Sequence, residues 1–247
     1  MNNTQLLLIN DMCGYGKVAL SAMLPVLSHM GYRIHNLPTA LVSDTLNYPK
    51  FYIHDTTEYV RQSLAIWEEL GFEFDAISTG FIVTEEETRI ISDFCHRRAA
   101  KGTKVFVDPI MGDNGRLYAD YTVPNYTEAC LLTDTPMREG ITAGEAHALV
   151  DAVRELGAKS VVVTSANVDG KSAVIGYDHV AGEHFFIPFE LIPVYFPGTG
   201  DTFSSVLLGR VMAGWTLQRA TADAMRVVSE LIARNASQQD KSAGLPI

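Results

Sequence analysis

A glycine-rich segment at 196–209 has the residue types that anion binding and proton transfer need. Its centre reads Gly198-Thr199-Gly200-Asp201, and an apolar, helix-like run follows. Glycines let the backbone fold tightly so that successive amides point one way, and the following helix adds the positive end of its dipole. These features predict an anion-binding hole at a helix start. Asp201 lies at its mouth, where a carboxylate can accept a proton from an attacking hydroxyl. The alternative is that Asp201 only stabilises the helix N-terminus.

Two further clusters place oxygen ligands where a metal ion could bind. Asp108 ends a predicted buried strand and Asp113 follows the next turn. Such a pair suits a hydrated Mg²⁺, which prefers oxygen ligands, although both acids could instead cap turns. Asn125 and Glu128 are three residues apart, so one helical turn puts them on one face, where they can hold the water shell of a metal. The alternative is a capping box with Asn125 as the N-cap.

The elements that position these clusters alternate between short apolar runs and longer amphipathic runs. Strands are predicted at 6–10, 34–42, 75–82, 104–110 and 160–164, followed by a hairpin of 171–177 and 184–189. Helices are predicted at 17–30, 56–70, 84–102, 142–157, 201–213 and 217–235. This alternation predicts a three-layer α/β fold with a central, mostly parallel sheet and helices on both faces. Ligands of such sheets bind at the carboxyl ends of the strands, where Thr164 and Ser165 also lie.

Length and composition limit the classes of protein to consider. The 247 residues fit a single domain spanning 1–247. A net charge of −10 argues against a nucleic-acid partner, which calls for a basic surface. The three cysteines are far apart and form no C-x-x-C pair, so we expect reduced thiols and a cytoplasmic protein. The apolar runs are too short for a signal peptide or a membrane helix, and the polar tail after Asn235 is expected to be partly disordered.

The order and spacing of the clusters resemble the ribokinase-like superfamily, and specifically the pyridoxal (vitamin B6) kinases. The resemblance covers about 105–209 and takes in the clusters around Asp108, Asn125, Thr164 and Asp201 in that order. The segment LINDMCGYGK at 8–17 is similar to the opening strand and turn of bacterial pyridoxamine and pyridoxal kinases. LPTALVS at 37–43 is similar to their second strand, and TGF at 79–81 to the turn after their third.

The resemblance implies ATP-dependent phosphorylation of the hydroxymethyl group of a B6 vitamer. Asp201 would be the base that activates this hydroxyl, and the amides of Gly198, Thr199 and Gly200 would hold the developing phosphoryl charge. Asp108 and Glu128 would organise Mg²⁺, largely through water. The residues implied to lie along the nucleotide are Asn125, Thr164, Ser165, Asp113 and Tyr118. The resemblance also implies a homodimer and, in many such kinases, assistance by K⁺.

On the substrate side the resemblance implies five residues. Phe81 would pack on the pyridine ring, and Cys13 would lie near the ring substituents, where relatives often carry serine; the other three are Asn10, Asp44 and Tyr48. The chain departs from the family at 43–48, SDTLNY, where relatives carry a segment like Ser-Asn-His-Thr-Gly-Tyr/Phe. Asp44 adds a negative charge there that could favour a cationic amine such as pyridoxamine, or it could cap a turn. Cys13 could trap an aldehyde or be a buried, inert thiol.

Competing interpretations remain at this level. GYGKVA at 14–19 matches the dinucleotide fingerprint, but it lies too far from the strand at 6–10, and the first acid after the second strand comes too late. A P-loop is excluded because Val18 follows Lys17, where a hydroxyl is needed, and Asp11 replaces the first glycine. Within the fold, the alternatives are a hydroxymethylpyrimidine kinase and a non-catalytic vitamer-binding protein on the same scaffold.

Overall fold

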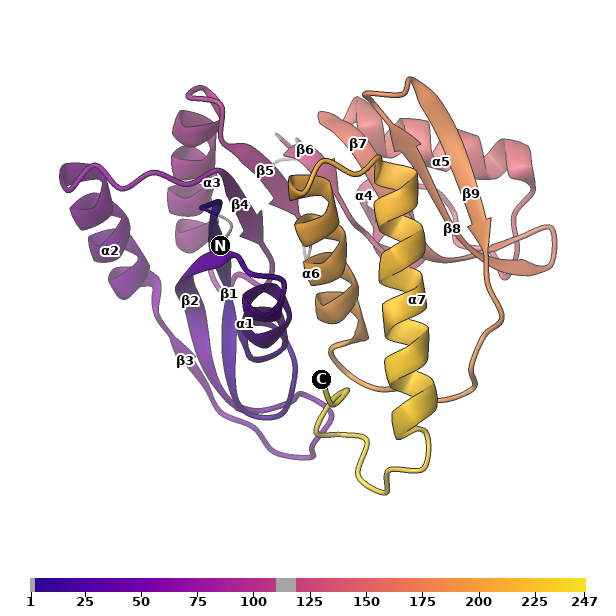
Figure 1. The fold of residues 1–247 in the computed structure, drawn as a ribbon, viewed down its shortest axis with the longest axis horizontal. Coiled ribbons are helices and arrows are strands. Elements are labelled where there is room, and N and C mark those ends of the chain that lie inside the picture. Colours follow the sequence, from indigo (N-terminus) through magenta and orange to yellow (C-terminus); the bar gives the residue numbers. More distant parts are fainter. Residues whose placement is uncertain (1–2, 110–118) are drawn as a thin grey trace.

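The computed structural model describes residues 3–109 and 119–247, and within these ranges nine strands form one sheet (Figure 1). The spatial order is β3-β2-β1-β4-β5-β6-β7-β8-β9. The strands are β1 (Gln5–Tyr15), β2 (Arg33–Asp44), β3 (Ile53–Asp55), β4 (Ala76–Thr79), β5 (Lys104–Val107), β6 (Ala119–Thr122), β7 (Ala158–Val168), β8 (Lys171–Asp178) and β9 (Glu183–Pro188). The central pairs from β2 to β7 are parallel, while β3, β8 and β9 are antiparallel to their neighbours.

Helices cover both faces of this sheet (Figure 1). One face carries α1 (Leu20–His29), α6 (Thr199–Met212) and α7 (Leu217–Asn235). The other carries α2 (Thr57–Glu69), α3 (Glu85–Ala99), α4 (Tyr126–Leu132) and α5 (Ala143–Glu155). The predicted α/β class, with a mostly parallel sheet and helices on both faces, is therefore confirmed.

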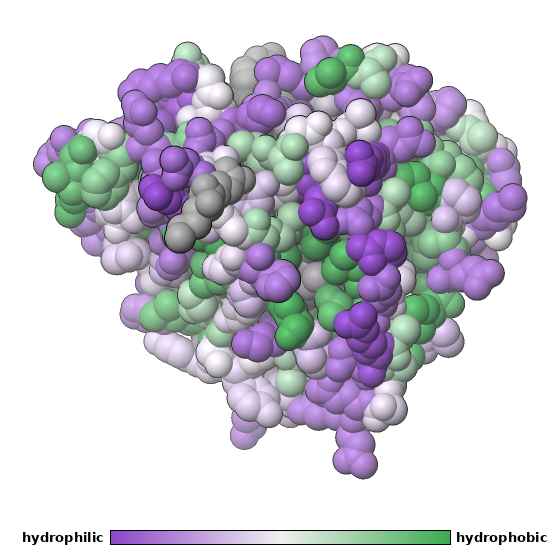
Figure 2. Space-filling model, in the orientation of Figure 1, coloured by the Kyte–Doolittle hydropathy of each residue, from purple (hydrophilic) through white to green (hydrophobic). Residues whose placement is uncertain are grey.

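Alternation along each strand sends side chains to both layers. In β1, Leu6 and Leu8 pack with α1, α6 and α7, whereas Leu7 and Ile9 pack with α2 and α3. All four are fully buried, as expected for a parallel strand covered on both faces. The outer side of α7 is polar, and its Arg226 pairs with Asp223 and Glu230; Figure 2 shows hydrophilic residues along this helix.

Two predictions about the ends of elements are wrong. The first strand continues through Gly14 to Tyr15, with a register shift between Asn10 and Met12 against β2. A side chain at Gly14 would place its Cβ 3.0 Å from the carbonyl oxygen of Ser43, so this glycine permits close strand contact and does not end the strand. The tail after Asn235 is ordered, and Leu245 within it is fully buried.

Candidate active site

The N-terminus of α6 forms one wall of the site. Gly198 is its N-cap, with φ 81° in the left-handed region that favours glycine. A Cβ at Gly198 would lie 2.0 Å from the carbonyl oxygen of Lys17, so no other residue fits. The helix then starts at Thr199, and Asp201 lies in its first turn. The first amides of a helix have no intrahelical partner, so those of Thr199 and Gly200 remain available to an anion.

Asp201 is held by two donors from the other half of the chain. The Ala19 amide and the Asn10 side chain hydrogen-bond to its carboxylate and lower its pKa, but burial is the larger effect and raises the pKa above the ordinary value. Ala19 is the N-cap of α1 and has φ 49° and ψ −134°, an unusual backbone conformation for alanine. Strain of this kind is often found at functional sites. In this backbone conformation the Ala19 amide points toward the Asp201 carboxylate.

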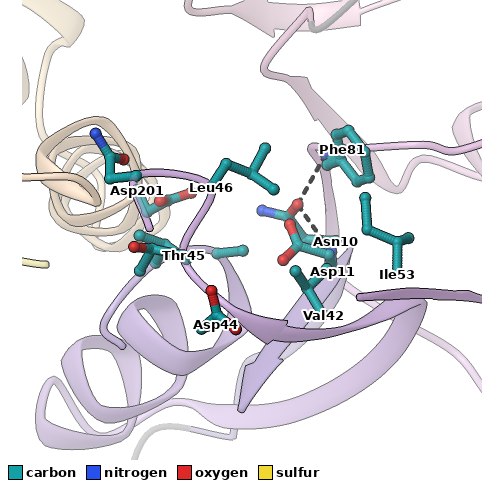
Figure 3. Close-up of a pocket in the computed structure, with 12 residues that line it drawn as sticks. Asn10, Asp11, Val42, Asp44, Thr45, Leu46, Ile53, Phe81 and Asp201 are labelled. Carbon is teal, nitrogen blue, oxygen red and sulfur yellow. Dashed lines mark hydrogen bonds between the residues drawn. The ribbon is translucent and has the colours of Figure 1, made fainter. Parts of the chain in front are cut away.

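Asn10 connects β1 to the turn after β4. Its Oδ1 accepts hydrogen bonds from the Phe81 amide at 2.8 Å and from the Asp11 amide at 3.0 Å (Figure 3). Gly80 is required beside it, because a Cβ there would lie 2.4 Å from Asn10 Nδ2. Asn10 therefore positions the Phe81 turn and, through its contact with Asp201, the start of α6.

These residues open into a cavity of about 230 Å³ at the carboxyl ends of β1 and β2 (Figure 3). Its lining residues are Asn10, Asp11, Val18, Ala19, Val42, Asp44, Thr45, Leu46, Asn47, Ile53, Phe81 and Asp201. The volume lies below the roughly 300–1,000 Å³ of drug-sized pockets, which limits the ligand to a small molecule. Among the residues that the structure describes, the lining contains carboxylates but no Lys, Arg or His.

A second group of carboxylates lies where β5 meets α6. Burial, followed by the charges of Asp201 and Glu128, raises the pKa of Asp108 to about 8. Ser204 on α6 donates a hydrogen bond to Asp108 Oδ2 at 3.5 Å, which joins the end of β5 to the helix. Burial also raises the pKa of Glu128, although its hydrogen bonds with Asn125 oppose this. These acids lie close enough to repel one another.

The structure contains the capping box that was the alternative for Asn125 and Glu128. The Glu128 amide donates to Asn125 Oδ1 at 3.0 Å, and the Asn125 amide donates to Glu128 Oε2 at 2.8 Å. The cap starts α4, and one oxygen of Glu128 remains beyond this interaction. Thr164 lies next to Asn125 through an isolated parallel bridge, and its amide donates to the Pro124 carbonyl. Ser165 has φ 61° at an irregularity between β7 and β8.

Several predicted site residues lie away from the cavity lining. Cys13 is buried and donates to the Tyr15 carbonyl, and burial followed by the charge of Asp11 raises the thiol pKa to about 11, so the thiol stays protonated. Tyr48 hydrogen-bonds to Asp240 in the C-terminal tail. Asp113 and Tyr118 lie outside the described residues.

Sequence reasoning missed some residues that the structure brings to the site. Asp11 lines the cavity, and burial followed by the charge of Asp201 raises its pKa to about 6. The available signal was its position directly after the apolar run at 6–10. Thr45 and Leu46 also line the cavity; they belong to the segment 43–48 that departs from the family, although neither was predicted as a site residue. Ile53 lines it as well, and no local pattern marks it.

No cluster of three or more His, Cys, Asp or Glu side chains in the described ranges could hold a metal ion on its own. Likewise, none of the described helices combines the length and apolar character needed to cross a membrane.

The fold and the α6 site together define an α/β kinase of the ribokinase-like type. A family model described as phosphomethylpyrimidine kinase matches residues 116–245, more than half of the 247 residues, and the chain therefore belongs to this family. A crystal structure of a Bacteroides thetaiotaomicron protein, provisionally described as a phosphomethylpyrimidine kinase, is 31% identical and has a TM-score of 0.91, covering 99% of this chain and 91% of that one. Another crystal form of that protein, 30% identical, contains pyridoxal.

Pyridoxal kinases are also among the relatives. The pyridoxal kinase of Lactobacillus plantarum is 25% identical with a TM-score of 0.85, covering 98% of this chain and 93% of that one. The pyridoxine/pyridoxal/pyridoxamine kinase of Bordetella avium is 26% identical over 244 residues, which is 89% of this chain and 81% of the relative. The expected membership of the ribokinase-like kinases is confirmed.

Proposed function

We propose that this protein transfers the γ-phosphoryl group of ATP to the hydroxymethyl group of a B6 vitamer (pyridoxal, pyridoxamine or pyridoxine) and so forms the 5′-phosphate and ADP. The observation that carries the proposal is that Asp201, at the glycine-opened start of α6, shares one small cavity with Asn10 and Phe81. The names of the Bordetella and Lactobacillus relatives, and the pyridoxal in the Bacteroides crystal, support this substrate class.

On the acceptor side, Asp201 takes the proton of the substrate hydroxyl as its oxygen attacks the γ-phosphorus. The bond from that phosphorus to the bridging oxygen breaks, and ADP leaves with the electron pair. Burial raises the pKa of Asp201 above its ordinary value, which makes the carboxylate a stronger base. Phe81 offers its ring to the pyridine face, and Asn10 keeps both Phe81 and Asp201 in place.

On the nucleotide side, the amides of Gly198, Thr199 and Gly200 stabilise the charge that develops on the transferred group. Asn125, Thr164 and Ser165 contact the ATP phosphates in this proposal, and the adjacency of Asn125 and Thr164 supports it. Asp113 and Tyr118 are proposed along the phosphate path from the family resemblance alone.

The carboxylates at the end of β5 fit a divalent cation. Asp108 is partly buried beside Asp201 and Glu128, and this burial, followed by the negative charges of the two neighbours, raises its pKa. Oxygen donors of this kind suit Mg²⁺, which would neutralise phosphate charge when bound with ATP. Asp108 and Glu128 would hold it, mainly through water. We expect chelation of Mg²⁺ to abolish turnover, and replacing K⁺ with a larger organic cation tests the dependence on K⁺.

The test is ADP formation with pyridoxal, pyridoxamine, pyridoxine and hydroxymethylpyrimidine, measured side by side. Asp201→Asn should lower kcat by about 10²- to 10⁴-fold, the usual contribution of a positioned acid or base. Asp93→Asn, an exposed change on α3, is the control and should retain full activity. Ligand binding without phosphorylation of any of these compounds would contradict the proposal and favour a non-catalytic binding protein.

Hydroxymethylpyrimidine is the second candidate substrate, because the matching family model carries the phosphomethylpyrimidine kinase description. A kcat/KM for this pyrimidine alcohol above those of all three vitamers would establish that alternative.

We further propose that the chain acts as a single domain within a cytoplasmic homodimer. The family resemblance supports the dimer, and the three free, buried cysteines agree with a reducing compartment. Light scattering after size-exclusion chromatography tests the oligomeric state.

A further inference from the structure

Asp44 carries an unpaired carboxylate oxygen at the cavity. It is the last residue of β2 and pairs in register with Tyr15 of β1. Its Oδ2 accepts a hydrogen bond from Ser43 Oγ at 2.7 Å. Its Oδ1 is buried and has no hydrogen-bond partner among the described residues. A buried carboxylate oxygen without a donor is costly, so a ligand group that donates to it would stabilise the complex.

The charges around the cavity define the chemistry of that group. Asp11, Asp44 and Asp201 all line it, and the described part of its lining has no Lys, Arg or His. The phosphates of ATP are anions and cannot balance these charges. Asp201 lies on the α6 side of the cavity and is assigned to the reacting hydroxyl, whereas Asp44 lies on the β2 side (Figure 3). The unmatched charge at Asp44 is therefore available to another part of the substrate.

We infer that Asp44 determines substrate specificity by binding the primary ammonium group of pyridoxamine. This inference rests on the proposed function. The vitamers differ in one ring substituent, which is an aldehyde in pyridoxal, an alcohol in pyridoxine and an aminomethyl group in pyridoxamine. Such an amine is protonated at neutral pH, as lysine is. Of the three ring substituents, only the aminomethyl group carries a positive charge and also donates a hydrogen bond. It can therefore form a charge-assisted hydrogen bond to the unpaired oxygen of Asp44.

The test compares kcat/KM for pyridoxamine and pyridoxine in wild type and Asp44→Asn. The wild-type protein should prefer pyridoxamine. Asp44→Asn keeps the size of the side chain and removes its charge, so the ratio of the two kcat/KM values should fall by about 10- to 100-fold, the usual worth of a hydrogen bond between charged groups. Asp93→Asn removes one charge from an exposed position on α3 and should leave the ratio at its wild-type value.

Binding measurements keep the inference testable if the asparagine variant folds poorly. Calorimetry of the wild-type protein with each vitamer in the absence of ATP should show tighter binding of pyridoxamine, and Asp44→Ser should remove the difference. Equal wild-type affinities, or an unchanged ratio in both variants, would overturn the inference. A dependence on K⁺ that is the same for every vitamer and is lost in Asp44→Asn would assign Asp44 to an inorganic cation and also overturn it.

Failure of the inference is distinguishable from failure of the proposed function. If all vitamers are phosphorylated without preference, only the role of Asp44 is wrong. If none is phosphorylated, the kinase proposal itself is wrong.

Discussion

At the scale of single residues, Gly198 and Gly200 form a matched pair. A Cβ at Gly198 meets the Lys17 carbonyl at 2.0 Å and also requires an unfavourable φ, whereas a Cβ at Gly200 meets nothing within 4 Å. Gly198→Ala should therefore destabilise the fold by about 1–3 kcal/mol or more and displace α6. Gly200→Ala should leave stability unchanged or slightly raised, since alanine favours helices. Urea denaturation measures both, and equal stabilities for the two variants would contradict the clash.

Glu87 makes stability depend on pH. It is fully buried in the first turn of α3, where its Oε2 accepts from the Val83 amide and its Oε1 has no partner in the described structure. Burial raises the pKa of Glu87 from 4.5 to about 7, and the charge of Asp55 adds to this. The folded state thus holds this proton more tightly than the unfolded state, so the contribution of Glu87 to stability is retained below pH 4.5 and is lost as pH rises to 7.

Glu87→Gln cannot ionise and should not suffer this loss. Its unfolding free energy relative to wild type should rise by about 3 kcal/mol between pH 4.5 and pH 8, given about 1.4 kcal/mol per pKa unit. Denaturation at several pH values measures this difference. Glu85→Gln, an exposed neighbour in the same turn, is the control, and a parallel pH profile for the two variants would contradict the role of Glu87.

The residue types predicted which side chains lie at the site, but they did not predict which groups these side chains contact. The spacing of Asn125 and Glu128 allowed either a metal site or a capping box, and the structure shows the box without excluding a metal beyond it. Thr84 and Glu87 also have capping-box spacing, and the Glu87 amide donates to Thr84 Oγ1 at 3.0 Å. The Glu87 carboxylate, however, accepts from the Val83 amide at 3.0 Å, so only half of the box is formed. Spacing fixes the face of a helix but not which amide a long side chain reaches.

At the scale of elements, the C-terminal segment 240–245 joins three parts of the site. Ala243 accepts a hydrogen bond from the Lys17 amide at 2.8 Å, and Leu245 donates one to the Pro197 carbonyl at 3.0 Å. Ser242 accepts from Thr45 Oγ1. The segment therefore ties the β1–α1 turn and the residues after β2 to the loop that starts α6. Its polar composition suggested disorder, because composition carries no information about backbone partners elsewhere in the chain.

Leu245 anchors this segment and provides a test. Leu245→Ala removes a fully buried side chain, which usually costs about 2–5 kcal/mol, and should release the segment. The Lys17 amide should then exchange with solvent faster, as measured by hydrogen exchange. Ile247→Ala makes a comparable change at a residue that is 49% exposed and should leave this protection intact. Unchanged protection in Leu245→Ala would show that the segment is held by other contacts.

At the scale of the whole molecule, the cavity joins distant parts of the chain. Its residues come from the first three strands, the loops after β1 and β2, the turn after β4, and α6, so a ligand that binds there contacts segments that are far apart in the sequence. A nucleotide and a vitamer at about 100 times their Kd should each add about 2.7 kcal/mol to stability. Thermal denaturation should show a Tm increase of at least about 5 °C with either ligand and at least about 11 °C with both, at about 2–4 °C per kcal/mol for a chain of this size. No shift at saturation would contradict binding to the folded state.

The sequence predicted the sheet because long, strongly patterned elements are readable without tertiary information. Runs such as 6–10 and 160–164 are apolar enough to identify buried parallel strands. The short strands β3 and β6 were not predicted, since their sequences IHD and ADYT contain no apolar run, whereas the similarly short β5 contains the apolar run 105–107. The position of the polar clusters at the strand ends could be predicted from the fold class. The residues after β2 that line the cavity could not, because their position depends on how the loops pack. Local patterns do not encode that packing.

The ordered C-terminal segment also has a practical consequence for protein production. Ile247 lies only two residues beyond Leu245, whose backbone holds the Pro197 loop. An affinity tag or fluorescent fusion joined after Ile247 would disturb the hydrogen bond between Leu245 and Pro197, and with it the loop that starts α6. A tag joined ahead of Thr4 enters at the opposite end of β1, away from the cavity, and is the better choice for kinetic work and for surface immobilisation.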